Sequence, residues 1–272
     1  MNTSHIRYVH GVDFSGAENA GKSIWIATGI IKGKTLEIEE IRPAKELPLS
    51  GRKREESLRA LVDIISQEKE AIIGMDFPFG LPAPLVEDDS WESFVLSFTN
   101  RFASPEEFKE KCFSAANNKE LRRTTDKEQH TPFSPYNLRL YRQTYYGIHN
   151  LINALVRDHL AYFPPMQTPS PDKTLIIEIC PAATLKKDRL YFRYKGKDSM
   201  HYYNRLLILK RLKKAGLEIT QLDLRPKILK DSKGDALDSL IAAFTAFRAL
   251  RNLIPFNPPQ QGAYNMEGYV YA

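Results

Sequence analysis

Three acidic segments of this chain have residue types and spacing suited to metal chemistry. Asp13 and Asp76 each follow a short apolar run, and such runs, bounded by turn residues, predict strands buried on both faces. Asp235 and Asp238 lie three residues apart at the start of a predicted helix, so they share one helix face. Because ligands of open α/β sheets gather beyond the carboxyl ends of the strands, we expect these acids to meet there.

A hard cation is the expected partner of these four carboxylates. Clustered carboxylates without a basic neighbour in sequence repel one another and take up protons, unless a cation lies between them. The sequence therefore predicts an Mg²⁺ or Mn²⁺ site with Asp13, Asp76, Asp235 and Asp238 as its ligands. Each acid also has a structural alternative, since aspartate favours turn starts and the first turn of a helix.

Glu178 is a fifth acidic candidate. It lies among apolar neighbours in a strand predicted over residues 174–180. One interpretation places it beside the four aspartates as a catalytic residue. The other interpretation is an ion pair with a core arginine or exposure on an edge strand. It is the one favoured when Glu178 is considered by itself.

A basic segment predicts contact with nucleic acid. The chain carries a net charge of +6, and eleven of its Lys and Arg residues fall between Lys186 and Lys214, interleaved with aromatic residues. Basic groups can follow a phosphate backbone while aromatic rings stack on bases. A solvated helix face explains the same residues equally well. The candidate nucleic-acid contacts are Lys186, Lys187, Arg189, Arg193, Lys195 and Lys197, together with Arg142.

Composition limits the class of protein. The chain has 272 residues, of which 42% are hydrophobic, and it contains no apolar run of the length that spans a bilayer. Its polar start lacks the apolar stretch of a secretory signal. We therefore expect a soluble, cytoplasmic protein with no membrane partner. Cys112 and Cys180 have no zinc-type spacing and are expected to be reduced.

The predicted elements follow a β-β-β-α-β-α-β-α order. Strands are expected over residues 6–13, 24–31, 35–42, 71–76 and 174–180, and helices over 54–68, 138–163, 199–214 and 235–250. Further helices near residues 91–102 and 105 onward indicate a helical insertion at about 88–165. We interpret residues 1–272 as one α/β domain with a mixed sheet flanked by helices.

Residues 16–23 match the phosphate-binding pattern GxxxxGK[ST], but their context argues against a nucleotide loop. Such a loop must open a helix, so that backbone N–H groups face the phosphates. The residues that follow, 24–31, are rich in β-branched side chains and predict a strand instead. We interpret residues 16–23 as a glycine-rich turn between two strands.

The order of these motifs resembles the ribonuclease H-like superfamily. The chain is most similar to an uncharacterised family of predicted RNase H-like nucleases, and the paired acids at the start of the last helix resemble those of RuvC-type resolvases. The segments that carry the resemblance are Gly11-Val12-Asp13, Met75-Asp76-Phe77-Pro78-Phe79-Gly80-Leu81-Pro82, Glu178-Ile179-Cys180-Pro181 and Asp235-Ala236-Leu237-Asp238.

The resemblance implies a nuclease that hydrolyses phosphodiester bonds with two metal ions. Asp13 would bridge the ions, and Asp76 with Asp235 or Asp238 would complete their coordination. Glu178 would be an additional member of the site. Two alternatives remain open. One is a non-catalytic nucleic-acid-binding module of the same fold. The other is an ATP-dependent phosphotransferase of the actin and sugar-kinase type, which should show a second glycine-rich loop.

Overall fold

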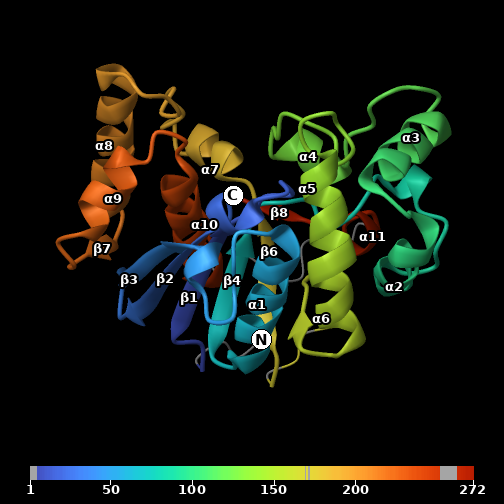
Figure 1. Ribbon diagram of the computed structural model, residues 1–272, viewed down its shortest axis with the longest axis horizontal. Helices are drawn as coiled ribbons and strands as arrows, with labels where there is room; N and C mark the ends of the chain where they lie inside the picture. The colour runs from blue at the N-terminus through green and yellow to red at the C-terminus, as the bar shows by residue number, and fades with distance from the viewer. Residues whose placement is uncertain (1–4, 169, 171, 252–261) are drawn as a thin grey trace.

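A mixed β-sheet lies at the centre of the molecule (Figure 1), and helices cover both of its faces. The computed structural model describes residues 5–168, 170, 172–251 and 262–272. Strands β1 (Tyr8–Asp13), β2 (Trp25–Lys32) and β3 (Thr35–Pro43) are antiparallel neighbours. On the other side of β1, β4 (Ala71–Met75) and β6 (Thr174–Ile179) continue the sheet in parallel.

Three short strands complete the sheet. β5 (Ala161–Tyr162) and β8 (Val270–Tyr271) both pair with β6, and β7 (Leu217–Ile219) pairs with β3. The strand order is β5-β6-β4-β1-β2-β3-β7, with β8 beside β6. The carboxyl ends of the parallel strands β1, β4 and β6 therefore lie at one edge of the sheet.

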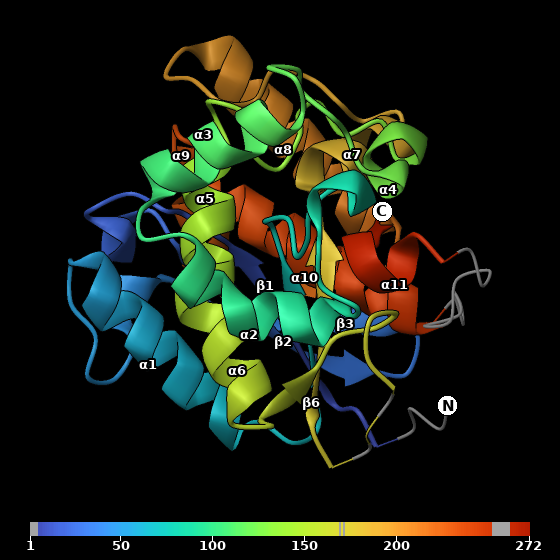
Figure 2. The ribbon, with the colours of Figure 1, turned by 90° about the vertical axis from the view of Figure 1, so that its right-hand side faces the viewer.

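Alternating side chains divide the core between the two faces of the sheet. In β4, Ile72 packs in the cluster that includes α10 (Asp235–Arg251), whereas Ile73 packs in the cluster that includes α1 (Arg54–Gln67). Helices α8 (Ser199–Lys214) and α9 (Leu224–Lys230) contribute to the first cluster. Figure 2 shows α1, α2 (Trp91–Arg101) and α6 (Asn153–Arg157) together on the other side.

Helix α10 lies directly on β1 because Gly11 leaves room for it. A Cβ atom added at Gly11 would lie 2.1 Å from the carbonyl oxygen of Ser239 and 2.1 Å from the amide nitrogen of Ala243. Atoms at that separation overlap, so any side chain here would push the helix away from the sheet. The close contact fixes the first turns of α10 relative to the carboxyl end of β1.

The predicted α/β class, with a mixed sheet flanked by helices, is confirmed. The long helix predicted over residues 138–163 is wrong at both ends. The helical segment consists of α5 (Tyr141–Tyr146), a π-helical stretch η4 (Gly147–Ile152) and α6. Residues after α6 instead turn back, and Ala161 pairs with Thr174 as part of β5. Pairing with a distant strand therefore prevails over the local helical pattern.

Several short elements have no counterpart in the prediction. They are η1 (Ala20–Lys22), η2 (Ala44–Glu46), η3 (Ala83–Leu85), α4 (Thr124–Glu128), α7 (Pro181–Lys187), α9, α11 (Tyr264–Glu267), β5, β7 and β8. The second insertion helix, α3 (Pro105–Ala115), was expected from its capping sequence, and the Ser104 side chain accepts a hydrogen bond from the Glu107 amide. Within the described ranges, no helix has the length and apolar character to cross a membrane.

Candidate functional site

Strand register places Asp13 and Asp76 on the face of the sheet that α10 covers. Gly11 and Gly74 are paired residues of β1 and β4, and a Cβ atom on either would collide with α10. Asp13 and Asp76 each follow one of these glycines by two residues, so their side chains emerge on the same face. The Asp76 amide donates to the Val12 carbonyl over 3.0 Å, which continues the pairing to the strand ends.

The first turn of α10 brings the remaining two aspartates to this edge. The Ala236 amide donates to Asp231 Oδ2 over 2.9 Å, so Asp231 rather than Asp235 satisfies this donor at the helix start. Asp238 is 2% exposed, one turn into the helix, and Asp235 is partly buried. The alternative in which Asp235 serves only as the N-cap of this helix is therefore wrong, because Asp235 is the first residue of α10.

Burial and mutual repulsion perturb the acids strongly. Burial, followed by the charges of Asp238 and Asp76, raises the pKa of Asp13 well above its usual range. Burial and Asp238 raise the pKa of Asp76 to about 8. Burial and Asp231 raise the pKa of Asp235 to about 6. Asp13, Asp76, Asp235 and Asp238 thus interact as one group, which we call the carboxylate cluster.

Lys195 supplies a positive charge to the carboxylate cluster. Its Nζ lies 2.6 Å from Asp238 Oδ2, and the Tyr194 hydroxyl donates to Asp238 Oδ1 over 2.5 Å. Burial lowers the pKa of Lys195, but Asp238 and Asp13 outweigh burial and the pKa is raised. The expectation that the cluster lacks a basic partner is therefore wrong. Lys195 is distant in sequence and arrives from the loop between α7 and α8.

The loop that carries Tyr194 and Lys195 is held in place from two sides. Buried Arg205 of α8 donates to the carbonyl oxygens of Tyr194 and Gly196 over 2.5 and 3.0 Å. On the other side, Gly234 has a φ of +84°, and a Cβ atom there would lie 3.1 Å from Lys195 Cγ. Sequence analysis missed both supports, although Arg205 stands out as a charged residue in the buried stripe of α8.

Glu178 binds a different set of partners, although its charge also raises the pKa of Asp76. It pairs in register with Met75, whose side chain packs on the α1 face, opposite the carboxylate cluster. Its two oxygens accept from Arg123 Nη1 and Nη2 over 2.8 and 2.5 Å, and Oε2 also accepts from the Phe79 amide over 2.9 Å. Arg123 also binds Asp126. The expected alternative, an ion pair with a core arginine, is confirmed.

The donor chemistry of the carboxylate cluster suits a hard cation, but its present arrangement is not a closed shell of ligands. Buried aspartates with raised pKa values lack the positive charge that Mg²⁺ or Mn²⁺ would bring. Among the described residues, however, no three His, Cys, Asp or Glu side chains are grouped closely enough to hold a metal ion. Both Asp238 oxygens are occupied by Lys195 and Tyr194. A cation that binds Asp238 at Oδ2 would therefore compete with Lys195 for that oxygen.

The other predicted basic residues do not join the cluster through any contact seen in the described chain. Lys186 donates to the His130 carbonyl over 3.0 Å, and Lys187 to the Ala272 carbonyl over 2.6 Å. Arg142 pairs with Glu106 at 2.8 Å. The exposed residues Arg189, Arg193 and Lys197 lie in the same stretch as Lys195.

Two histidines and the glycine-rich segment make contacts outside the carboxylate cluster. His10 contacts Thr28 through Nδ1 at 3.0 Å, and His201 pairs with Asp198 at 2.6 Å. Residues 16–23 end in the single 3₁₀ turn η1 and lead into β2. Since no α-helix begins there, the interpretation of this segment as a turn between strands is confirmed.

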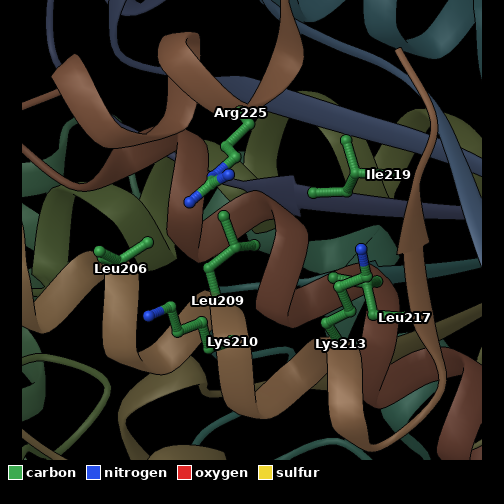
Figure 3. A pocket seen from close by; sticks show the side chains of 7 residues that line it. All are labelled: Leu206, Leu209, Lys210, Lys213, Leu217, Ile219 and Arg225. Carbon is green, nitrogen blue, oxygen red and sulfur yellow. The ribbon is translucent and has the colours of Figure 1, made fainter. Parts of the chain in front are cut away.

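Two cavities differ in their relation to the cluster. One, of about 160 Å³, is lined by Asp76, Phe77, Phe133 and Gln143 among others. The second, of about 260 Å³, lies among α8, β7 and α9 (Figure 3). Its lining has apolar side chains, including Leu209 and Leu217, and a rim of Lys210, Lys213 and Arg225, with none of the predicted catalytic acids. Only the first cavity adjoins the carboxylate cluster.

Comparison with protein-family models, curated proteins and solved structures finds no match to this chain.

Proposed function

We propose that this protein is a metal-dependent nuclease with a ribonuclease H-like fold. The strand order β3-β2-β1-β4-β6, with β1 to β3 antiparallel and β4 and β6 parallel to β1, supports that fold. The observation that carries the functional proposal is the carboxylate cluster. Burial and the charge of Asp238 raise the pKa values of both Asp13 and Asp76.

Asp13, Asp76, Asp238 and Asp235 would hold the metal. When bound, Mg²⁺ or Mn²⁺ supplies an activated water and stabilises the charge that develops on the phosphate. The chain itself limits access of bulk water, because Asp13 and Asp238 are 8% and 2% exposed. Tyr194, through its hydrogen bond, keeps the Asp238 carboxylate in one orientation.

Lys195 is positioned to bind the phosphate of the substrate. Its side chain is 54% exposed although its Nζ contacts buried Asp238, so it can turn outward when a cation takes that carboxylate. An ammonium group beside the scissile phosphate would balance negative charge in the transition state. Arg189, Arg193 and Lys197, exposed on the same stretch, extend this positive surface for a nucleic-acid backbone.

A second candidate is a nucleic-acid-binding module without catalysis. The ion pair of Lys195 with Asp238 favours it, because this contact partly neutralises the cluster without any metal. In that case the acids would serve only to position Lys195.

Metal binding separates the two candidates more directly than a cleavage assay. We would titrate Mn²⁺ into the wild type and the Asp13→Asn variant by calorimetry, with Asp63→Asn, an exposed acid of α1, as the matched control. The nuclease proposal predicts binding in the wild type and in Asp63→Asn, and its loss in Asp13→Asn. Equal heats in all three, or none, would contradict the proposed metal site.

A cleavage assay tests the same acids. DNA and RNA in single-stranded, duplex and branched forms should be cut by the wild type only with Mg²⁺ or Mn²⁺ present. The Asp13→Asn, Asp76→Asn double variant should be inactive. Full hydrolysis by that double variant would disprove the assignment of these acids.

A further inference from the structure

The cavity of about 160 Å³ beside Asp76 has the size of a single small ring system. A liquid water molecule takes roughly 30 Å³, so the space holds about five waters, which is less than a drug-sized ligand requires. Its lining comes from the loop after β4, the segment around Phe133, the start of α5 and the end of β6. Asp76 is part of both this lining and the carboxylate cluster, so a group in the cavity lies next to the proposed metal site.

The cavity is not an anion site, although Arg123 lines it. The five N–H groups of the Arg123 guanidinium donate to Asp126, Glu178 and the Glu267 carbonyl oxygen. No donor of this side chain is left for a phosphate or a carboxylate. The Asp126 and Glu178 carboxylates that also line the space would repel an anion.

What the cavity offers is apolar surface and hydrogen-bonding groups. Phe133 and Leu140, both partly exposed, form apolar walls. The Gln143 amide nitrogen donates one of its two N–H groups to the Asp76 carbonyl, so its second N–H and its carbonyl oxygen remain for a ligand. The Thr131 hydroxyl donates to Asp126 over 3.0 Å and keeps only lone pairs. A neutral, flat ligand with N–H donors on one edge matches this set.

We propose that this cavity receives one unpaired nucleobase of the substrate, next to the phosphate at the carboxylate cluster. Every nucleobase has a stacking face and at least one N–H donor on its pairing edge, and in a duplex that edge is engaged by the partner strand. The substrate is therefore single-stranded, or has a base turned out of the helix. Arg139, whose guanidinium lies 5.5 Å from the Phe133 ring centre, provides a cation near the cavity for a neighbouring phosphate. This inference rests on the proposed nuclease function, which supplies the nucleic acid.

The test measures binding in EDTA, so that it does not depend on hydrolysis. The probe is a fluorescent single strand of about 12 nucleotides and mixed sequence, compared by anisotropy with a strand of the same length in which every base is removed. The proteins are the wild type, Phe133→Ala and Leu140→Ala. Leu96→Ala, at an exposed position on α2, is the matched control, and thermal unfolding verifies that each variant is folded.

Stacking is worth about tenfold or more in affinity for each base, judged from alanine substitutions. We expect the wild type and Leu96→Ala to bind the base-bearing strand at least tenfold more tightly than the abasic strand. Phe133→Ala and Leu140→Ala should lose most of that difference and keep their affinity for the abasic strand. Equal wild-type affinity for both strands, no binding of either, or an unchanged preference in folded Phe133→Ala would overturn the proposal.

The result is separable from the nuclease proposal. Metal-dependent cleavage without a base preference in binding would retain the nuclease and remove the base pocket. A base preference that depends on Phe133, in a protein that neither binds Mn²⁺ nor cleaves, would retain the pocket and remove the nuclease.

Discussion

Two groups of buried acids lie on opposite faces of the same sheet and differ in how their charge is balanced. On the α1 face, Glu178 and Asp126 share the guanidinium of Arg123, whose fifth N–H donates to the Glu267 carbonyl, so all five are used. On the α10 face, the four acids of the carboxylate cluster share Lys195, whose one ion pair in the described chain is with Asp238.

The two groups differ in how fully a positive charge is shared among their acids. Burial by itself lowers the pKa of Arg123, but Asp126 and Glu178 outweigh it and hold that pKa well above its usual range. Burial also raises the pKa of Glu178, but the charge and the hydrogen bonds of Arg123 oppose that rise. In the carboxylate cluster, burial and the charge of Asp238 raise the pKa of Asp76 to about 8, although Lys195 opposes them. Strongly perturbed acids that lack a full set of partners are typical of sites that bind a ligand.

Removing Arg123 should produce the largest loss of stability. Arg123→Met would leave Glu178 and Asp126 buried without a positive charge beside them, and breaking a buried pair in this way typically costs about 3–5 kcal/mol. Chemical denaturation measures the change in the free energy of unfolding. Arg142→Met, which breaks the exposed pair with Glu106, is the control and should change stability by less than about 1 kcal/mol. Similar values for the two variants would remove the contrast between buried and exposed pairs.

Removing a charge from the carboxylate cluster should increase stability, whereas removing Arg123 decreases it. The reason is that the charges of the cluster are destabilising in the metal-free protein. The pKa of Asp76 is about 8 in the folded chain, against 3.8 as its ordinary value. Between these values the folded state keeps a proton that the unfolded state releases, so Asp76 lowers stability progressively as pH rises from about 4 to about 8. Asp76→Asn removes this effect.

We expect Asp76→Asn to match the wild type in stability near pH 4 and to exceed it by roughly 2–4 kcal/mol at pH 8, measured without metal. The exposed control Asp63→Asn should show no such trend with pH. A gain for Asp76→Asn that is the same at both pH values would mean that Asp76 is not protonated in the folded protein. With added Mn²⁺ the wild type should become more stable than Asp76→Asn, because the metal binds and stabilises only the wild-type site.

The sequence was sufficient for the parts of the fold that local patterns determine. The apolar runs before Asp13 and Asp76 correctly predicted β1 and β4, and the spacing of Leu237, Leu240, Ile241 and Phe244 predicted α10. Short strands such as β5 were missed, because two residues carry no periodicity and exist as a strand only through pairing with β6. The ribonuclease H-like assignment stays a proposal.

The candidate site could be predicted only in part from the sequence, because its arrangement also depends on pairing between segments that are distant in the chain. Alternation along the strands separates Asp13 and Asp76 from Glu178, since Gly11 and Gly74 face α10 whereas Glu178 pairs with Met75 on the other face. That distinction requires the register of β4 with β6, and the sequence alone does not reveal which residues of two strands are paired. Lys195 was missed as a partner of Asp238 for a similar reason. Tyr194, its neighbour, is separated from Asp238 by 44 residues.

The smallest predicted effect concerns Lys195, and it sharpens the contrast between its role and that of Arg123. Lys195→Met removes a half-exposed cation, so we expect a loss of stability well below that of Arg123→Met, because solvent screens such a pair. Under the nuclease proposal, however, Lys195 competes with metal for Asp238. Calorimetry should therefore show Mn²⁺ binding about fivefold or more tightly in Lys195→Met, while cleavage is reduced because the phosphate loses its cation.

Tyr194→Phe separates competition from a general change in the site. It removes the hydrogen bond to Asp238 Oδ1 but leaves Lys195 in place, so its effect on Mn²⁺ affinity should be smaller than that of Lys195→Met. If Lys195 instead served only to neutralise a structural cluster, Lys195→Met would lose stability increasingly as pH rises, and its Mn²⁺ affinity would not increase. A tighter metal site combined with slower cleavage would assign Lys195 to the substrate rather than to the fold.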